Sequence, residues 1–198
     1  ILPGSAFEYY SGMGFNRSVN TDPDGSYYAM RSVNSTKYLI IQSYKLEYSD
    51  TVTLLENLKN FEKIDEQDGF TIFKNKAYIP IGYSNSYYIS DDEYEKIAKS
   101  NRDNMLARAV VLTDEQIEKY GDILPELEPD RYSDFNYYTF EKDAQELAKT
   151  AVDTFTPTAN GFKATSSFTE DRFVTFTVPW ESGWSATING EKAEIEKV

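Results

Sequence analysis

The chain has 198 residues, a formal net charge of −13 at pH 7, and neither cysteine nor histidine. With 40% apolar and 15% aromatic residues it can bury one substantial core or two small ones, which excludes a disordered chain. The composition also excludes disulfides, thiolate metal sites and catalytic pairs built on cysteine or histidine. The acidic charge opposes binding to nucleic acid, which depends on basic groups.

The N-terminal part is predicted to begin irregularly and then to form a short helix and a strand. Residues 1–25 have the composition of an irregular or partly helical lead-in, and Ser26 is a suitable N-cap for a helix that reaches Val33. The apolar run at residues 38–41 is typical of a buried strand. No run of 18 or more apolar residues occurs, so no membrane-spanning helix is predicted.

A β-hairpin is the clearest prediction in the next segment. Residues 61–66 and 70–74 flank Asp68-Gly69, a pair that readily adopts the positive φ angles of a tight turn. A further strand is expected over residues 77–89, with Pro80 at its start or on a sheet edge.

Three helical segments should follow. Ser90 and Thr113 are each followed three residues later by Glu93 and Gln116, respectively, which is the capping-box pattern of a helix start. Between these two helices, a third is expected over residues 101–111.

The C-terminal part is expected to begin after a linker. Residues 124–132 contain two prolines and many charged residues, which favours an exposed connection. From Thr139 onward, the spacing of Phe140, Ala144 and Leu147 predicts an amphipathic helix.

Short strands are predicted for the rest of the chain. They cover residues 161–165, 173–178, 184–188 and 193–198. Asn189-Gly190 is the strongest hairpin signal in the sequence. Alternation within the second strand places Val174, Phe176 and Val178 on one buried face. Since the last strand ends without a turn signal, we expect the chain to stop short of the natural domain end and to leave an exposed strand edge.

One sequence pattern resembles a calcium loop. Asn20, Asp22, Asp24 and Gly25 occupy its first, third, fifth and sixth positions, but Arg31 stands where the loop needs a bidentate glutamate. The pattern therefore favours an ordinary turn.

Other motifs also favour structural explanations. The acidic residues 91–93 suit the positive end of a helix dipole, and the N-glycosylation patterns at residues 16–18 and 34–36 matter only in a eukaryotic secretory route. The sequence has no nucleophile elbow and no glycine-rich phosphate loop. No catalytic residue, metal ligand or cofactor is predicted.

Three stretches resemble the YfhO-like family of bacterial membrane proteins. Residues 69–83 read GFTIFKNKAYIPIGY and look like a family strand followed by Asn, Pro, Gly and an aromatic residue. Residues 176–190 read FTVPWESGWSATING and resemble a family hairpin with Pro-aromatic, Gly-Trp and Asn-Gly pairs. Residues 32–40 read SVNSTKYLI and are similar to a family segment that precedes the first strand.

The resemblance implies a polytopic membrane protein with a large extracytoplasmic domain, related to membrane glycosyltransferases that use polyprenyl-phosphate sugars. The family is linked to sugar decoration of cell-wall polymers such as lipoteichoic acid. In such transferases the catalytic carboxylates lie in loops beside the membrane helices, so the resemblance assigns no catalytic residue here. The implied partners are the membrane-spanning remainder of the chain and a lipid-linked sugar or cell-wall polymer, on the extracytoplasmic side of the cell membrane.

Trp180 and Trp184 are the candidate binding residues of the second stretch. Either ring could stack on a sugar, and Trp184 could instead anchor a sheet face behind a turn at Gly183. Both interpretations remain open at this point.

The sequence thus predicts an α+β fold. A mixed helix–strand subdomain is expected at residues 1–135, and a helix with a β-sandwich-like subdomain at residues 136–198. The expected role is recognition or scaffolding within a membrane protein that glycosylates cell-wall polymers. A freestanding secreted carbohydrate-binding module is the alternative, and an extracellular hydrolase with two converging carboxylates is a third interpretation.

Overall fold

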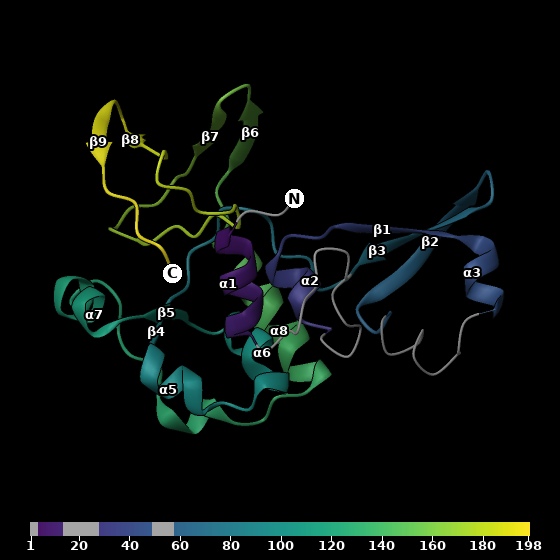
Figure 1. Ribbon diagram of the computed structural model, residues 1–198, viewed down its shortest axis with the longest axis horizontal. Helices are drawn as coiled ribbons and strands as arrows, with labels where there is room; N and C mark the ends of the chain where they lie inside the picture. The colour runs from purple at the N-terminus through teal and green to yellow at the C-terminus, as the bar shows by residue number, and fades with distance from the viewer. Residues whose placement is uncertain (1–3, 14–27, 49–57) are drawn as a thin grey trace.

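The computed structural model describes residues 4–13, 28–48 and 58–198, which form the α+β fold predicted from the sequence (Figure 1). A body of helices lies at the centre, a three-stranded sheet extends from one side, and two β-hairpins lie on another (Figure 1). The α-helices are α1 (Gly4–Gly12), α2 (Met30–Val33), α3 (Ser43–Tyr48), α5 (Asp91–Lys96), α6 (Arg102–Met105), α7 (Asp114–Tyr120) and α8 (Tyr137–Ala148). The strands are β1 (Tyr38–Gln42), β2 (Phe61–Gln67), β3 (Phe70–Asn75), β4 (Tyr88–Ser90), β5 (Val110–Leu112), β6 (Thr154–Thr158), β7 (Gly161–Thr165), β8 (Ala186–Ile188) and β9 (Glu191–Ala193).

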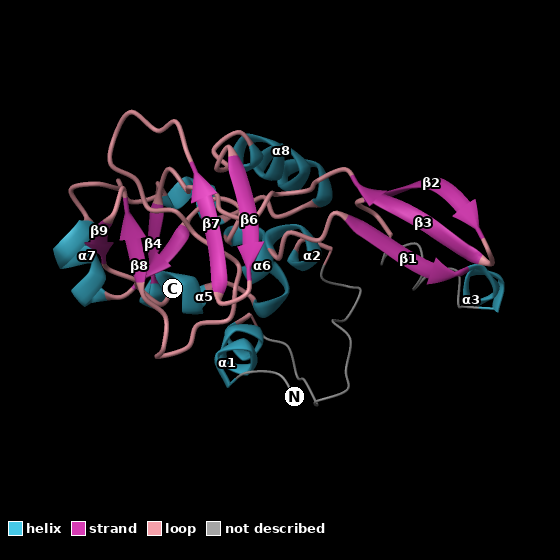
Figure 2. Ribbon diagram, turned by 90° about the horizontal axis from the view of Figure 1, so that it is seen from above, coloured by secondary structure: helices cyan, strands magenta, loops and turns pink. Residues whose placement is uncertain are grey.

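The three-stranded sheet projects from the body as an arm (Figure 2). Its antiparallel strands have the order β1-β3-β2, and Asp68 and Gly69 turn the β2–β3 hairpin with φ angles of 51° and 79°, as predicted. The prediction that the first strand is buried is wrong, because Tyr38 is 48% and Ile40 is 61% exposed. One face of the antiparallel arm meets solvent instead of the body.

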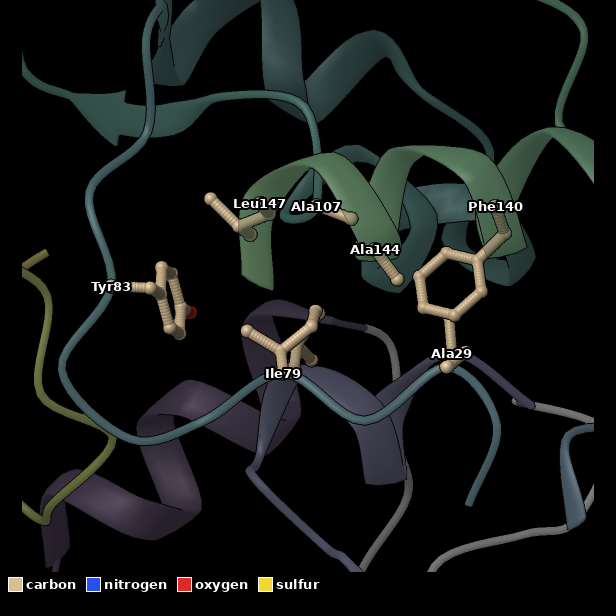
Figure 3. Packing of buried hydrophobic residues seen from close by; sticks show 9 residues of the cluster. Ala29, Ile79, Tyr83, Ala107, Phe140, Ala144 and Leu147 are labelled. Atoms are coloured by element: carbon tan, nitrogen blue, oxygen red, sulfur yellow. The ribbon is translucent and has the colours of Figure 1, made fainter. Parts of the chain in front are cut away.

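Residues 77–89 do not form the single strand predicted for them, and only the short β4 lies in a sheet there. The side chain of Asn75 accepts a hydrogen bond from the Ala77 amide at 3.0 Å, which turns the chain out of β3. Gly82 has a φ of 78°, which regular strands do not adopt. The segment between them crosses the core, where Ile79 is fully buried (Figure 3).

The predicted helix starts at Ser90 and Thr113 are confirmed. Ser90 accepts a hydrogen bond from the amide of Glu93, and Thr113 forms a reciprocal capping box with Gln116. The helix predicted over residues 101–111 is wrong beyond Met105. The apolar, partly β-branched residues after it form β5, which pairs parallel to β4 and is covered by α5 and α7.

The segment predicted to be a linker is packed into the body. Leu124 is 3% exposed and Leu127 is fully buried. The amide of Tyr88 donates to the carbonyl of Pro125, and the amide of Leu127 donates to the carbonyl of Tyr88, so the segment runs beside β4. The segment packs against the body because burying the two leucines is favourable, while the charged residues around them can stay exposed.

The C-terminal helix α8 is confirmed, with Phe140, Ala144 and Leu147 buried. After it, β6–β7 and β8–β9 form separate two-stranded sheets, so the predicted sandwich is not confirmed. The predicted β7 and the Asn189-Gly190 turn are present, the latter with φ angles of 54° and 89°.

Two predicted C-terminal strands are largely wrong. Residues 173–178 form no strand and make only an isolated bridge between Thr175 and Tyr83. All six are half-buried, so the predicted buried face of Val174, Phe176 and Val178 is wrong. Residues 194–198 form no strand either, and the exposed strand edge expected there is absent from the described residues. Their side chains contact α7 instead, where Glu196 accepts a hydrogen bond from Tyr120 at 2.7 Å.

The main core lies between α8, α2 and the segment after β3 (Figure 3). Its buried members come from both sides of residue 135 and are Ala29, Val33, Ala77, Ile79, Tyr83, Ala107, Phe140, Ala144 and Leu147. The division into two subdomains at residue 135 stays a prediction. The calcium-loop pattern, the Ser26 cap and the glycosylation pattern at residues 16–18 lie outside the described residues.

Candidate functional site

The three stretches that carry the family resemblance meet in space at the junction between the arm and the body. The side chain of Asn75 in the first stretch donates to the Ser32 hydroxyl at 3.1 Å and to the Thr36 carbonyl at 2.9 Å, both in the third stretch. Ser35 and Thr177, which belong to the third and second stretches, share a hydrogen bond of 3.1 Å. The junction therefore joins residues that are up to 142 positions apart.

Gly82 in the first stretch packs against Phe176 in the second. A Cβ atom at Gly82 would lie 2.8 Å from Cε1 of Phe176 and 2.9 Å from Cγ2 of Val152. Next to this contact, Tyr83 and Thr175 exchange two backbone hydrogen bonds of 3.1 and 2.7 Å. Only glycine allows the chain to pass so close to the Phe176 ring with a positive φ.

Trp184 is a packed residue of the junction rather than a free ring. Its indole ring lies 5.8 Å from the ring of Phe162, which in turn lies 4.7 Å from that of Phe176. Its Nε1 donates to the Pro179 carbonyl at 3.2 Å, and its Cζ3 would lie 3.3 Å from a Cβ atom at Gly161. These contacts favour the structural role for Trp184.

Trp180 lies more loosely on the surface. It is 39% exposed, and its described ring partner is the ammonium group of Lys197, 5.9 Å from the ring centroid. Lys197 also pairs with Glu8 in α1. Trp180 thus keeps part of one ring available to a ligand, and a sugar would compete with Lys197 for it.

We expect replacement by alanine to destabilise the protein more at Trp184 than at Trp180. Trp184→Ala should lower the free energy of unfolding by about 2 kcal/mol, because it removes the ring contact with Phe162 and the hydrogen bond to the Pro179 carbonyl. Trp180→Ala should lower it by only about 0.5 kcal/mol, the value of an exposed cation–π contact. Urea denaturation of the two variants measures the difference. Equal losses would contradict the distinction.

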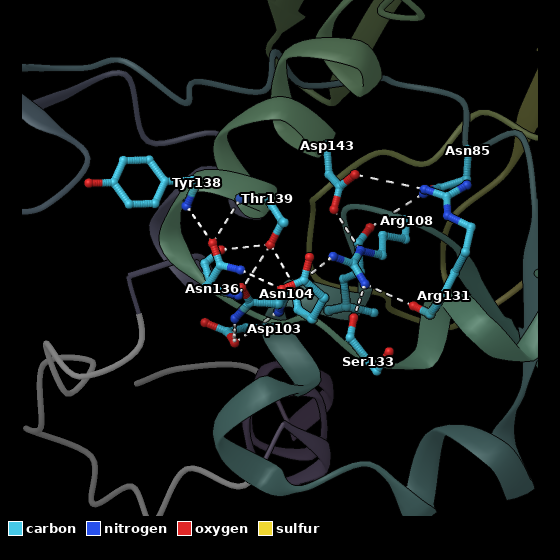
Figure 4. Close-up of polar contacts among 12 residues, drawn as sticks. Asn85, Asp103, Asn104, Arg108, Arg131, Ser133, Asn136, Tyr138, Thr139 and Asp143 are labelled. Carbon is cyan, nitrogen blue, oxygen red and sulfur yellow. Dashed lines mark hydrogen bonds and ion pairs between the residues drawn. The ribbon is translucent and has the colours of Figure 1, made fainter.

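A buried carboxylate, Asp103, holds the start of α2 against α6 (Figure 4). One carboxylate oxygen accepts from the amide of Met30 at 3.1 Å, and the other accepts from the amide and the side chain of Asn104 at 2.9 Å each. Asn104 in turn accepts a hydrogen bond from the Tyr28 hydroxyl at 2.7 Å. The sequence did not predict this group.

Burial raises the pKa of Asp103 from its ordinary value of 3.8 to about 6, and the hydrogen bonds from Asn104, Met30 and Ala29 oppose only part of that rise. The hydrogen-bond partners that the structure describes for it are neutral amide groups. The same carboxylate contributes to raising the pKa of Tyr28 to about 12, although burial of that phenol is the larger cause.

This environment predicts an unusual pH dependence. Because the pKa of Asp103 is higher in the folded than in the unfolded chain, the folded state binds the proton more tightly between pH 4 and 6. Stability from this group should therefore rise by about 2 kcal/mol as the pH falls from 7 to 4, and approach about 3 kcal/mol below the unfolded-state pKa, at 1.36 kcal/mol per pKa unit. The measurement is the difference in unfolding free energy between the wild type and Asp103→Asn at each pH, which cancels the titration of other carboxylates. A constant difference would contradict the prediction.

Arg108 ties residues 131–135 to α8 (Figure 4). Its Nε donates to the Asp143 carboxylate at 2.6 Å, and its terminal nitrogens donate to the carbonyls of Arg131, Ser133 and Asp134 at 2.8, 2.7 and 3.3 Å. The guanidinium also lies 4.9 Å from the centre of the Phe135 ring. The side chain is 6% exposed, so this is a buried and fully paired charge.

The segment held by Arg108 forms one wall of an open depression of about 440 Å³. The other wall comes from α5 and the residues that follow it. The lining residues are Glu93, Lys96, Ile97, Ala98, Asn101, Tyr132, Ser133, Asp134 and Phe135. Glu93 in this depression is paired with Lys96 at 2.5 Å.

The acidic run at residues 91–93, noted in the sequence, has a structural role at a helix start. Asp91, Asp92 and Glu93 form the first turn of α5, where the Asp91 side chain accepts from the amide of Asp92 at 2.9 Å. Within the described residues, no group of three or more acidic side chains is arranged to hold a metal ion.

Comparison of the chain with family models, with curated proteins and with solved structures found no match. Across residues 4–13, 28–48 and 58–198, none of the helices has both the length and the apolar character needed to cross a bilayer.

Proposed function

We propose that the chain is an extracytoplasmic domain of a YfhO-like polytopic membrane protein that glycosylates cell-wall polymers from lipid-linked sugars. Its role there is recognition or scaffolding, and the chemistry belongs to the membrane-spanning part of the same protein. The observation that carries the proposal is the junction at which the three resembling stretches meet through Asn75, Gly82 and Thr177. Residues shared with a family for structural reasons are expected to contact one another, as these do.

The charge distribution fits a scaffold held near a membrane by its own chain. A net charge of −13 opposes adsorption to an anionic leaflet and direct contact with a polyphosphate polymer. A neutral sugar escapes this repulsion, and the partly exposed Trp180 offers a ring on which one can stack.

The test uses the full-length parent protein in its own cells. Replacing residues 4–198 by a short flexible linker, with the membrane part retained at its normal level, should abolish sugar decoration of the polymer, measured by NMR of the extracted polymer. Unchanged decoration would contradict the proposal. Trp180→Ala separates the two roles, because it should reduce decoration if the domain recognises sugar by stacking and leave it unchanged if the domain is a scaffold.

The exposure of Trp180, 39%, favours the carbohydrate-binding module as the second candidate. Such a module needs no membrane part, so the purified chain should bind a neutral oligosaccharide in calorimetric titration and lose that binding in Trp180→Ala. Hydrophobic segments of about 20 residues in the parent gene distinguish the first proposal from this one.

A further inference from the structure

Within residues 4–13, 28–48 and 58–198, the β1 strand is an open sheet edge, in contrast to the opposite edge of the same arm. No described residue pairs with β1 on the side away from β3. Its residues, Tyr-Leu-Ile-Ile-Gln, include no charge. At the β2 edge, a register shift between Lys63 and Asp65 and the charged residues 62, 63, 65 and 66 oppose pairing with another strand, so this is the guarded edge.

The hydrogen bonds of the arm show which backbone groups of β1 face outward. The Asn75 amide donates to the Lys37 carbonyl, and the Ser43 amide donates to the Gly69 carbonyl. In an antiparallel ladder such hydrogen-bonded residues alternate with residues whose amide and carbonyl point away from the partner strand. The outward groups are therefore those of Tyr38, Ile40 and Gln42.

The side chains of these same three residues lie on the solvent face of the arm. Tyr38 and Ile40 are 48% and 61% exposed, and Phe70, which pairs with Gln42, is 40% exposed. The free backbone groups and the exposed apolar side chains thus occur at the same positions of one strand.

We propose that this edge pairs with the β1 strand of a second copy of the chain, antiparallel and centred on Ile40. This register places Ile40 opposite Ile40 and Tyr38 opposite Gln42, so that the outward amides and carbonyls of all three residues are satisfied in both copies. The two arms then form one six-stranded sheet.

Charge argues for a second copy as the partner. Residues 37–76 contain six lysines and seven acidic residues, a balance of −1, so −12 of the net charge of −13 falls on the rest of the chain. The arm projects away from that body (Figures 1 and 2), so pairing through β1 joins nearly neutral parts and keeps the two acidic bodies apart.

Sedimentation velocity of the 198-residue chain over a series of concentrations tests the proposal, with a matched pair of variants. The wild type should show a monomer–dimer equilibrium. Ile40→Lys places two lysines opposite each other at the two-fold axis and should raise the dissociation constant at least about tenfold. Ile64→Lys is the control, because Ile64 is also exposed, at 49%, but lies on the guarded edge. It should change the constant less than about threefold.

A single cysteine tests the register directly, since the natural chain contains none. Opposed residues of a hydrogen-bonded antiparallel pair have Cα atoms about 5.5 Å apart, within the range that a disulfide spans. Ile40→Cys should therefore oxidise to a covalent dimer much faster than Ile64→Cys. A wild type that stays monomeric at every concentration, or equal behaviour of the two lysine variants or of the two cysteine variants, would overturn the proposal.

Discussion

Gly82→Ala should lower the free energy of unfolding by about 3 kcal/mol. About 1–2 kcal/mol comes from holding alanine at a φ of 78°, a region unfavourable for residues with a Cβ atom. The remainder comes from overpacking, because the new Cβ would lie 2.8 Å from Phe176 and 2.9 Å from Val152. Urea denaturation gives the value, provided that the slope with denaturant is unchanged.

Gly69→Ala is the matched control for the backbone contribution. Gly69 has nearly the same φ, 79°, but a Cβ added there, in the β2–β3 turn, would meet no atom within 4 Å. This variant should lose only about 1 kcal/mol. If the two alanine variants lose equal amounts, the contact between Gly82 and Phe176 contributes nothing, and the junction of the three resembling stretches is looser than the structure indicates.

Features with a purely local cause were predictable from the sequence. The turn at Asp68-Gly69, the turn at Asn189-Gly190 and the cap at Thr113 depend on residues within four positions of one another. The helix α8 was predictable because its buried stripe recurs at helical spacing. Each of these elements is specified by residues within the element itself.

Features decided by distant contacts were not predictable. Residues 173–178 alternate like a strand, yet their neighbours offer only Tyr83 as a bridging partner, so no ladder forms. Residues 124–132 look like a linker because of their prolines, but Leu124 and Leu127 fill places beside β4 and β5 that no sequence window reveals.

The sequence around the buried charged residues contained some information from which their burial could have been predicted. Arg108 is the single charged residue in the run from Met105 to Leu112, and such an isolated charge among apolar residues indicates a buried and paired group. Asp103 gave a weaker signal, because its partners at Met30 and Ala29 lie more than 70 positions away. Both candidate tryptophans were predictable from the sequence, but only the fold separates the packed Trp184 from the more accessible Trp180.

Arg108→Met should lower the free energy of unfolding by about 3–5 kcal/mol. Methionine keeps much of the side-chain volume but removes the ion pair with Asp143 and the hydrogen bonds to three backbone carbonyls. It also leaves the Asp143 carboxylate, 18% exposed, without its closest cation. The depression lined by residues 132–135 should loosen as a result, which hydrogen exchange of that segment would detect.

Two further variants show whether the burial of Arg108 is the cause. Arg131→Met removes a cation that also faces Asp143, at 3.7 Å, but its side chain is 41% exposed, so the loss should stay below about 1 kcal/mol. In the double variant Arg108→Met/Asp143→Asn the cost should be smaller than the sum of the two single costs, because no unpaired carboxylate remains. If Arg108→Met costs no more than Arg131→Met, or if the two costs simply add, the guanidinium is not the tie between residues 131–135 and α8 that its four hydrogen bonds indicate.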